Sequence, residues 1–125
     1  YRVCDLFLDT FPYNAGTTAS DALWSGVPVL TLMGQSFASR IAASLLNAIG
    51  LPELITSSQK EYETLAIELA MNPQRLAGIK SKLIYARLTA PLFDTPIFVK
   101  NLESTYIRMY KRDQLGMQQD HLFIP

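Results

Sequence analysis

Two threonines and an aspartate follow a glycine-containing turn near the start of the chain, and their chemistry suits a phosphate and a sugar. Thr17 and Thr18 come just after Asn14 and Gly16, and Asp21 follows one helical turn later. A helix that begins here presents free backbone N–H groups and the positive end of its dipole, which together bind phosphate. The threonine hydroxyls add donors, and the Asp21 carboxylate can accept hydrogen bonds from sugar hydroxyls. This spacing predicts a site for a nucleoside diphosphate.

The same residues also have purely structural interpretations. Thr18 and Asp21 have the spacing of a capping box, whose side chains satisfy the first N–H groups of a helix. Asn14 and Gly16 are residue types that commonly shape turns. On spacing alone, ligand binding and helix capping are both open, and the two roles can coexist.

The basic residue Arg40 has two candidate roles. It is the only Lys or Arg between Arg2 and Lys60, and it lies near the expected start of a helix. Its guanidinium either reaches a phosphate or pairs with one of the aspartates at positions 5, 9 and 21, and we favour the ion pair. Asp9 itself ends an expected strand, where a carboxylate most often caps the following loop.

The remaining reactive side chains favour structural roles. Cys4, the only cysteine, adjoins an apolar strand and is expected to be a small buried side chain. Trp24 is expected in the core, and His121 is expected in solvent. The sequence has no zinc-ligand spacing, serine-hydrolase elbow or Walker loop. We therefore assign neither a catalytic residue nor a metal ligand within this chain.

The composition excludes several classes of protein. The 125 residues are enough for one domain, 49% of them are apolar, and the formal net charge is zero. A neutral chain does not suit a general nucleic-acid or anionic-membrane binder, which needs a basic surplus. No stretch approaches the roughly 20 apolar residues of a membrane span, and a single cysteine excludes an intrachain disulfide. We expect a cytoplasmic protein that binds neither nucleic acid nor membrane.

Strands and helices are expected to alternate in the first half of the chain. Apolar runs at 3–9 and 29–32 and a short run at 53–56 predict strands, and the first of these is expected to be buried and parallel. Helices are predicted by capping residues, apolar periodicity and the Gly or Pro residues that end them. Ser36 and either Ser57 or Ser58 are the expected caps of the second and third helices, Phe37 and Tyr62 are expected on inward faces, and Gly116 is expected to end the last helix. We expect helices at 18–25, 37–49, 59–71, 73–88 and 96–115.

This order predicts an α/β layer fold with parallel strands. Two or three strands are too few for a complete doubly wound sheet, so we expect further strands upstream of Tyr1. In such sheets ligands bind beyond the carboxyl ends of the strands. The loop at 10–18 lies at one of those ends.

Three segments resemble the catalytic region of O-linked N-acetylglucosamine transferases. They are 8–18, with the sequence LDTFPYNAGTT, 21–31, with DALWSGVPVLT, and 38–46, with ASRIAASLL. The sequence Phe-Pro-Tyr-Asn at 11–14 resembles that of the bacterial and SPINDLY-like branch of the family. The resemblance continues through 61–63, 91–95 and 102–106, and it covers almost the whole chain.

The resemblance implies both the architecture and the site. Members of the family have two Rossmann-like lobes, an arrangement called GT-B, usually preceded by tetratricopeptide repeats. Residues 1–125 would form the C-terminal part of the second, donor-binding lobe, and the helix at 96–115 would pack back toward the first lobe. Thr17 and Thr18 would contact the diphosphate of the donor and Asp21 its ribose, with Asn14 and Gly16 in the same substrate-binding set.

One position departs from the family pattern. The best-known members carry histidine where Gly16 stands. Glycine keeps the tight turn but removes a side-chain donor to the phosphates. The resemblance also places three features upstream of Tyr1: a lysine that helps the leaving diphosphate, a histidine near the nucleotide base, and the residues that bind the acceptor.

The activity that the resemblance implies is transfer of N-acetylglucosamine, with inversion, from UDP-GlcNAc to serine or threonine of a protein acceptor. The reaction would need no metal or other cofactor. GDP-fucose is an alternative donor, because the sequence at 11–14 resembles the SPINDLY-like branch. An alternative of another class is a non-catalytic lobe that binds a nucleotide or serves as a scaffold. In either case we expect the isolated chain to be inactive.

Overall fold

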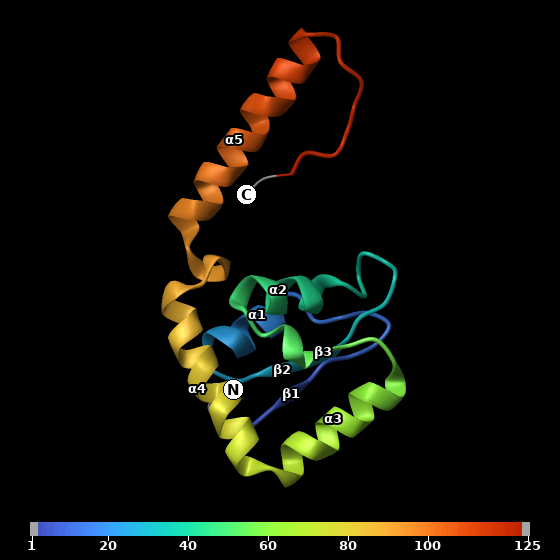
Figure 1. Ribbon diagram of the computed structural model, residues 1–125, viewed down its shortest axis with the longest axis vertical. Helices are drawn as coiled ribbons and strands as arrows, with labels where there is room; N and C mark the ends of the chain where they lie inside the picture. Colours follow the sequence, from blue (N-terminus) through green and yellow to red (C-terminus); the bar gives the residue numbers. More distant parts are fainter. Residues whose placement is uncertain (1–2, 124–125) are drawn as a thin grey trace. The chain divides into compact units, whose positions relative to one another are not determined.

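A small parallel sheet lies at the centre of residues 3–93 in the computed structural model, which describes residues 3–123 (Figure 1). The sheet contains β1 (Phe7–Leu8), β2 (Val29–Leu32) and β3 (Ile55–Thr56) in the order β1-β2-β3. Both strand pairings are parallel, with Phe7 opposite Val29 and Thr31 opposite Ile55. The predicted α/β fold with parallel strands is therefore confirmed.

Helices cover both sides of this sheet. The helices of this part of the chain are α1 (Thr17–Trp24), α2 (Ile41–Ile49), α3 (Gln59–Met71) and α4 (Pro73–Thr89), with short 3₁₀ helices η1 (Pro52–Leu54) and η2 (Pro91–Phe93). α1, α2 and α3 each pack against β2. α1 and α2 lie on one side of the strands and α3 on the other (Figure 1). α4 contacts the other three helices, so it links the two sides.

The core lies between the sheet and these helices. All four residues of β2 are buried, which agrees with a continuous apolar strand at the centre of a parallel sheet. Each helix adds a fully buried leucine: Leu23 from α1, Leu46 from α2, Leu69 from α3 and Leu83 from α4. Burying a leucine side chain contributes about 1.5–3 kcal/mol. These side chains hold the elements around the strand ends where a ligand is expected.

The first strand is shorter and more exposed than the sequence predicts. β1 covers Phe7–Leu8 rather than 3–9, Leu8 is 55% exposed, and Cys4 is also exposed. Within the described residues β1 is at the edge of the sheet, so only one of its sides has a paired strand. The expectation of a buried Cys4 was therefore wrong.

The second helix begins four residues later than predicted. α2 starts at Ile41, and Phe37 is 86% exposed instead of lying on the apolar face. Ser36 was predicted to cap this helix, but its hydroxyl lies 2.9 Å from the hydroxyl of Ser39. Serine side chains that bond locally in this way offer the backbone an alternative to helix.

The next two helices agree closely with the prediction. α3 has the predicted bounds, and its expected cap is present because Ser58 Oγ accepts a hydrogen bond from Glu61 N at 3.2 Å. α4 starts at Pro73 and ends at Thr89, one residue later than predicted. Asn72 Oδ1 caps α4 by accepting from Arg75 N at 3.0 Å.

The second compact unit contains α5 (Thr95–Gln114) and the tail that follows it. Asp94 Oδ1 accepts from Ile97 N at 3.0 Å and caps the helix. Gly116, with φ of +62°, follows its end, as predicted. No residue of α5 is buried, so the helix presents apolar side chains to solvent over its whole length.

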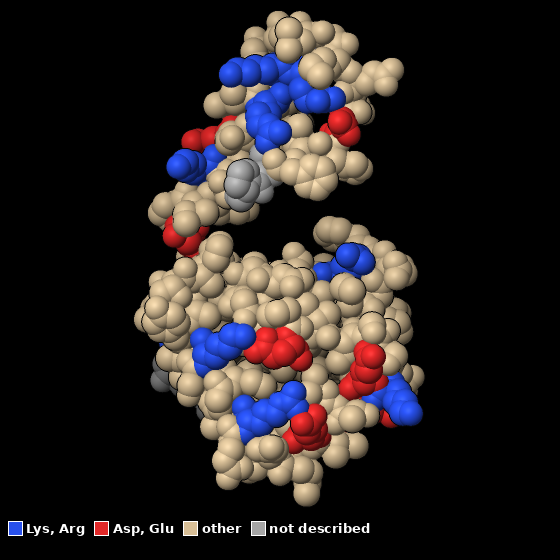
Figure 2. Space-filling model, in the orientation of Figure 1, with Lys and Arg blue, Asp and Glu red and all other residues tan. Residues whose placement is uncertain are grey.

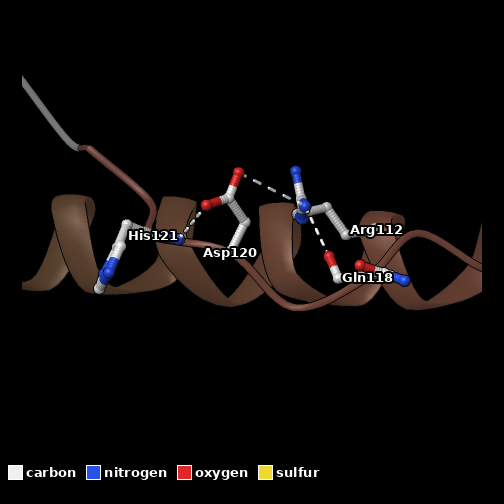
Figure 3. Close-up of polar contacts among 4 residues, drawn as sticks. All are labelled: Arg112, Gln118, Asp120 and His121. Atoms are coloured by element: carbon white, nitrogen blue, oxygen red, sulfur yellow. Dashed lines mark hydrogen bonds and ion pairs between the residues drawn. The ribbon is translucent and has the colours of Figure 1, made fainter.

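The tail returns alongside α5 and is fixed by arginines of the helix. Arg112 Nη2 donates to Gln118 O at 2.6 Å and lies 3.8 Å from Asp120 Oδ2 (Figure 3). Arg108 Nη1 donates to Phe123 O at 2.6 Å. His121 is exposed, as the sequence predicted.

Charges of both signs lie near one another on the visible face of residues 3–93 (Figure 2). Ion pairs in this unit include Lys82 with Glu53 at 2.8 Å and Arg75 with Glu68. Such exposed pairs contribute little, about 0.2–1 kcal/mol each, so the apolar core dominates the stability of the fold. Among the described residues, no helix combines the length and the apolar character needed to cross a membrane.

Candidate functional site

The carboxyl ends of β1 and β2 meet at one edge of the sheet, and the loop that leads to α1 starts there. Asp9 directly follows β1 and is 6% exposed. Its carboxylate accepts hydrogen bonds from Thr10 N at 2.8 Å, Ala15 N at 2.7 Å and Thr31 Oγ1 at 2.6 Å. The prediction that Asp9 caps the following loop is confirmed.

Asn14 is buried beneath the same loop and stabilises it with hydrogen bonds. Its side chain is fully buried, and Nδ2 donates to Thr10 O at 2.9 Å and Leu32 O at 3.4 Å. Its backbone N donates to Ala38 O at 3.0 Å. Oδ1 is buried and has no hydrogen-bond partner among the described residues. These contacts give Asn14 a role in shaping the loop, while a direct contact with substrate stays a prediction.

A second loop, at 33–40, supports the first. Gly34 N donates to Ser39 O at 2.9 Å, and Ser39 is 2% exposed. A Cβ atom on Gly34 would lie 2.5 Å from Ser39 Oγ and 2.8 Å from Ser39 Cβ, closer than real Cβ contacts. A residue larger than glycine at position 34 would therefore clash with Ser39 unless the loop shifted.

The predicted capping box is not formed at the start of α1. The helix begins at Thr17, one residue earlier than predicted, and its N-cap is Gly16, which has no side chain. Thr18 is thus the second residue of the helix and not its cap. Thr17 and Thr18 are both exposed, and within residues 3–123 nothing hydrogen-bonds to their hydroxyls or to their N–H groups.

Asp21 lies on the same face of α1 as the two threonines. The spacings of three and four residues bring these side chains together on a helix surface. Asp21 is exposed, and its carboxylate forms no ion pair or hydrogen bond with the described residues. The N-terminal part of α1 therefore offers free N–H groups, two hydroxyls and a carboxylate on one open surface. Donors of this kind suit phosphate oxygens, and the carboxylate suits a diol.

Gly16 has room for a side chain. A Cβ atom there would meet Ile41 Cγ2 at 3.5 Å, which is an ordinary contact. The same contact shows that the start of α2 lies against the start of α1.

The predicted ion pair of Arg40 is absent. Its Nη1 donates weakly to Gly34 O at 3.5 Å, whereas Asp5 pairs with Lys80 and Asp9 bonds to Thr31. Arg40 instead lines a cavity of about 520 Å³ together with apolar and polar side chains of the loop at 33–40 and of α2. Among the described residues no carboxylate neutralises its charge.

Trp24 lies at the other end of α1 and is not in the core, contrary to the prediction. Ala19 and Leu23 define the buried face of the helix, and Trp24 is 56% exposed. Its ring meets Phe93 edge to face, with centroids 5.1 Å apart. The guanidinium of Arg87 lies 5.7 Å from the Trp24 ring and also donates to Trp24 O. These contacts tie the end of α1 to η2 and α4.

Tyr62 of α3 also supports the loop, which sequence reasoning missed. Its hydroxyl donates to Asp9 O at 3.0 Å. Burial raises the pKa of Tyr62 above its usual value, and the nearby charge of Asp9 raises it further. The sequence predicts that Tyr62 points inward, but 53 residues separate the two partners, so no local pattern indicates the bond.

The model of glycosyl transferase family 41 matches residues 1–102. The chain belongs to glycosyl transferase family 41. The predicted family is thereby confirmed, and the segments that carry the resemblance, at 8–18, 21–31 and 38–46, all lie inside the matched region.

Two relatives are similar to this chain over nearly all of its length. The probable UDP-N-acetylglucosamine–peptide N-acetylglucosaminyltransferase SEC of Arabidopsis thaliana is 43% identical over 120 residues, which are 95% of this chain and 12% of that protein. The UDP-N-acetylglucosamine–peptide N-acetylglucosaminyltransferase of Caenorhabditis elegans is 37% identical over 121 residues, 97% of this chain and 10% of that protein. The chain thus spans about a tenth of the length of these relatives.

A solved structure of an O-GlcNAc transferase has the same fold over most of this chain. A mutant form of the O-GlcNAc transferase of Thermobaculum terrenum superposes with a TM-score of 0.79 at 38% identity. The superposition covers 85% of this chain and 20% of that one. The predicted fold class, part of a Rossmann-like lobe of a GT-B glycosyltransferase, is confirmed.

Proposed function

We propose that this chain is the nucleotide-sugar binding part of a protein O-GlcNAc transferase. That enzyme would move N-acetylglucosamine from UDP-GlcNAc to serine or threonine of a protein, with inversion at the sugar. The observation that carries the proposal is the open N-terminal part of α1, where the side chains of Thr17, Thr18 and Asp21 have no partner among the described residues. The relatives with 37–43% identity, which are named as UDP-GlcNAc–peptide transferases, support the choice of donor.

The chemistry assigned to this chain is stabilisation of the leaving diphosphate. When the bond between sugar and phosphate breaks, negative charge grows on the UDP that leaves. Fixed donors aimed at that charge lower the barrier without reorganising. The N–H groups and hydroxyls of Thr17 and Thr18 would supply such donors, and Asp21 would orient the donor through its ribose. We propose no metal or other cofactor for this step and assign no general base to this chain.

The rest of the enzyme would come from a longer parent protein. We propose that this parent contributes the first lobe of the GT-B pair, the acceptor site and tetratricopeptide repeats, and that it works in the cytoplasm. The short share of each relative that this chain spans supports a longer parent. The family resemblance supports the lobe and the repeats.

Nucleotide binding tests the proposed site directly. Titration of UDP and GDP into the full-length parent protein by calorimetry is expected to show tight UDP binding. Asp21→Ala should weaken it about tenfold or more, because a hydrogen bond to a charged group is lost. Glu63→Ala is the matched control, because Glu63 is an exposed helical carboxylate on α3, which lies on the other side of the sheet from α1 (Figure 1). It should bind UDP like the wild type.

The other outcomes separate the alternatives. A preference for GDP would favour fucose transfer from GDP-fucose. A well-folded parent that binds neither nucleotide would contradict the transferase proposal and favour a scaffold lobe. Equal binding by wild type and Asp21→Ala would remove the ribose role from Asp21.

We also propose that α5 packs against the first lobe of the parent. Phe98, Tyr106 and Tyr110 follow one another at spacings of eight and four residues, and they are 63%, 59% and 66% exposed. Apolar side chains repeated on one face of a helix indicate a partner surface. Hydrogen exchange should therefore be slow at α5 amides in the parent and fast in the 125-residue chain, with α2 amides as the internal control. Equal α5 exchange in both proteins would contradict the packing.

A further inference from the structure

Asp9 is an aspartate whose negative charge is placed close to a predicted phosphate site. Its carboxylate is buried and takes part in three hydrogen bonds, to Thr10 N, Ala15 N and Thr31 Oγ1, all between 2.6 and 2.8 Å. An anion near a diphosphate opposes binding electrostatically. The presence of Asp9 therefore needs an explanation other than charge.

The hydrogen bonds of Asp9 close the loop that precedes α1. One carboxylate oxygen, Oδ1, receives the N–H groups of both Thr10 and Ala15, which are five residues apart. Ala15 directly precedes Gly16, the N-cap of α1. The position of Oδ1 thus sets where the chain enters the helix, and with it the direction of the first N–H groups.

The other oxygen of the carboxylate connects this loop to the sheet. Thr31 Oγ1 donates to Asp9 Oδ2, and Thr56 Oγ1 donates to Thr31 O at 2.9 Å, so a line of polar contacts joins all three strands. Tyr62 Oη holds the carbonyl of Asp9 from α3. Thr31 is fully buried, and Thr56 is 5% exposed, so water competes little for these bonds.

We propose that Asp9 is a positioning residue for the donor nucleotide. It acts through the loop at 10–15 and does not touch the ligand, and Thr31 holds its carboxylate in place. This inference rests on the proposed function, because it assumes that phosphate binds at the first turn of α1. The geometry of the carboxylate matters, and its charge does not.

Asparagine separates geometry from charge at this position. In Asp9→Asn, Oδ1 keeps both backbone N–H groups, and Nδ2 donates to the Thr31 hydroxyl, which turns to accept. Asp9→Ala loses all three bonds. Thr31→Val keeps the shape of Thr31 and both loop bonds but leaves Oδ2 without its hydroxyl donor.

The experiment measures UDP affinity and donor kinetics in the full-length parent, with thermal unfolding as a check of folding. Asp9→Ala is expected to weaken UDP binding and to raise KM for the donor about tenfold, and Thr31→Val about threefold. Asp9→Asn should stay within about threefold of the wild type on the same scale. Asp5→Ala is the control. Asp5 is an exposed aspartate that precedes β1, whereas Asp9 follows it, and Asp5 pairs with Lys80.

A merely structural role would give a different result. Partial unfolding would lower the amount of active enzyme, and so the apparent kcat, while KM for the donor stayed unchanged. If wild type binds UDP and folded Asp9→Ala binds it equally well, the positioning role is overturned and the proposed function stands. If Asp9→Ala does not fold, Thr31→Val decides in the same way. If wild type binds neither UDP nor GDP, the proposed function fails and this inference fails with it.

Discussion

Replacing Leu46 by alanine is expected to lower the free energy of unfolding by about 2–5 kcal/mol. Leu46 is fully buried in α2, and α2 packs against β2, η1 and η2. The substitution removes apolar area from the core and leaves a cavity that the neighbouring elements fill only in part. Since small domains are stable by only about 5–15 kcal/mol, the variant should lose a large share of its stability.

Urea unfolding followed by far-ultraviolet circular dichroism would measure this change. All variants should be compared at one protein concentration, because the exposed face of α5 favours association. Leu88→Ala is the matched control, since Leu88 is 78% exposed on α4 and should change stability by no more than about 0.5 kcal/mol. An equal loss for both leucines would contradict the core described here.

Replacing Gly34 by alanine is expected to cost about 1–3 kcal/mol, as overpacking does in a tightly packed site. The added Cβ would fall 2.5 Å from Ser39 Oγ and 2.8 Å from Ser39 Cβ. Because the bond between Asn14 N and Ala38 O joins this loop to the loop before α1, UDP affinity of the parent should fall as well. The same unfolding experiment and a UDP titration would measure both effects.

Ser39→Gly provides the test of cause. By itself it removes the hydroxyl that bonds to Ser36 and should also destabilise the chain. Combined with Gly34→Ala it makes room for the new Cβ atom, so the double variant should lose less stability than the sum of the two single changes. Strictly additive losses would mean that the clash with Ser39 is not the reason.

The sequence predicted most of the α/β framework because its elements are marked locally. Pro73 and the capping residues Ser58 and Asn72 fix where α3 and α4 begin, and β2 is an uninterrupted apolar run. The parallel order followed from the alternation of strands and helices. The family was predicted from the segments around Thr17 and Arg40, and comparison confirmed it.

The errors arose where contacts between distant residues override local preference. Ser36 and Phe37 were predicted to start a helix, but the hydrogen bond from Gly34 N to Ser39 O closes residues 34–39 into a loop instead. Arg40 was predicted to form an ion pair with an aspartate. Asp5, one of the candidates, instead pairs with Lys80, which is 75 residues away in the sequence.

The candidate site could be predicted only in part. The exposed donors at the start of α1 follow from a local sequence of threonines after glycine. The contacts that support this turn could not be predicted locally. Asp9 bonds to Thr31, 22 residues away in the sequence, and to Tyr62, 53 residues away. Such pairings depend on strand order and helix placement, which a linear pattern does not encode. The substrate contacts of Asn14, Gly16, Thr17, Thr18 and Asp21 stay predictions.

Trp24 gives this chain an optical property. It is the only tryptophan, so fluorescence excited at the red edge of aromatic absorption comes from one ring. That ring is at the last residue of α1, beside Phe93 and Arg87, while the free N–H groups are at the first. Eight residues of helix span only about 12 Å. The emission spectrum therefore reports on the same short helix that carries the candidate site, without any label being attached.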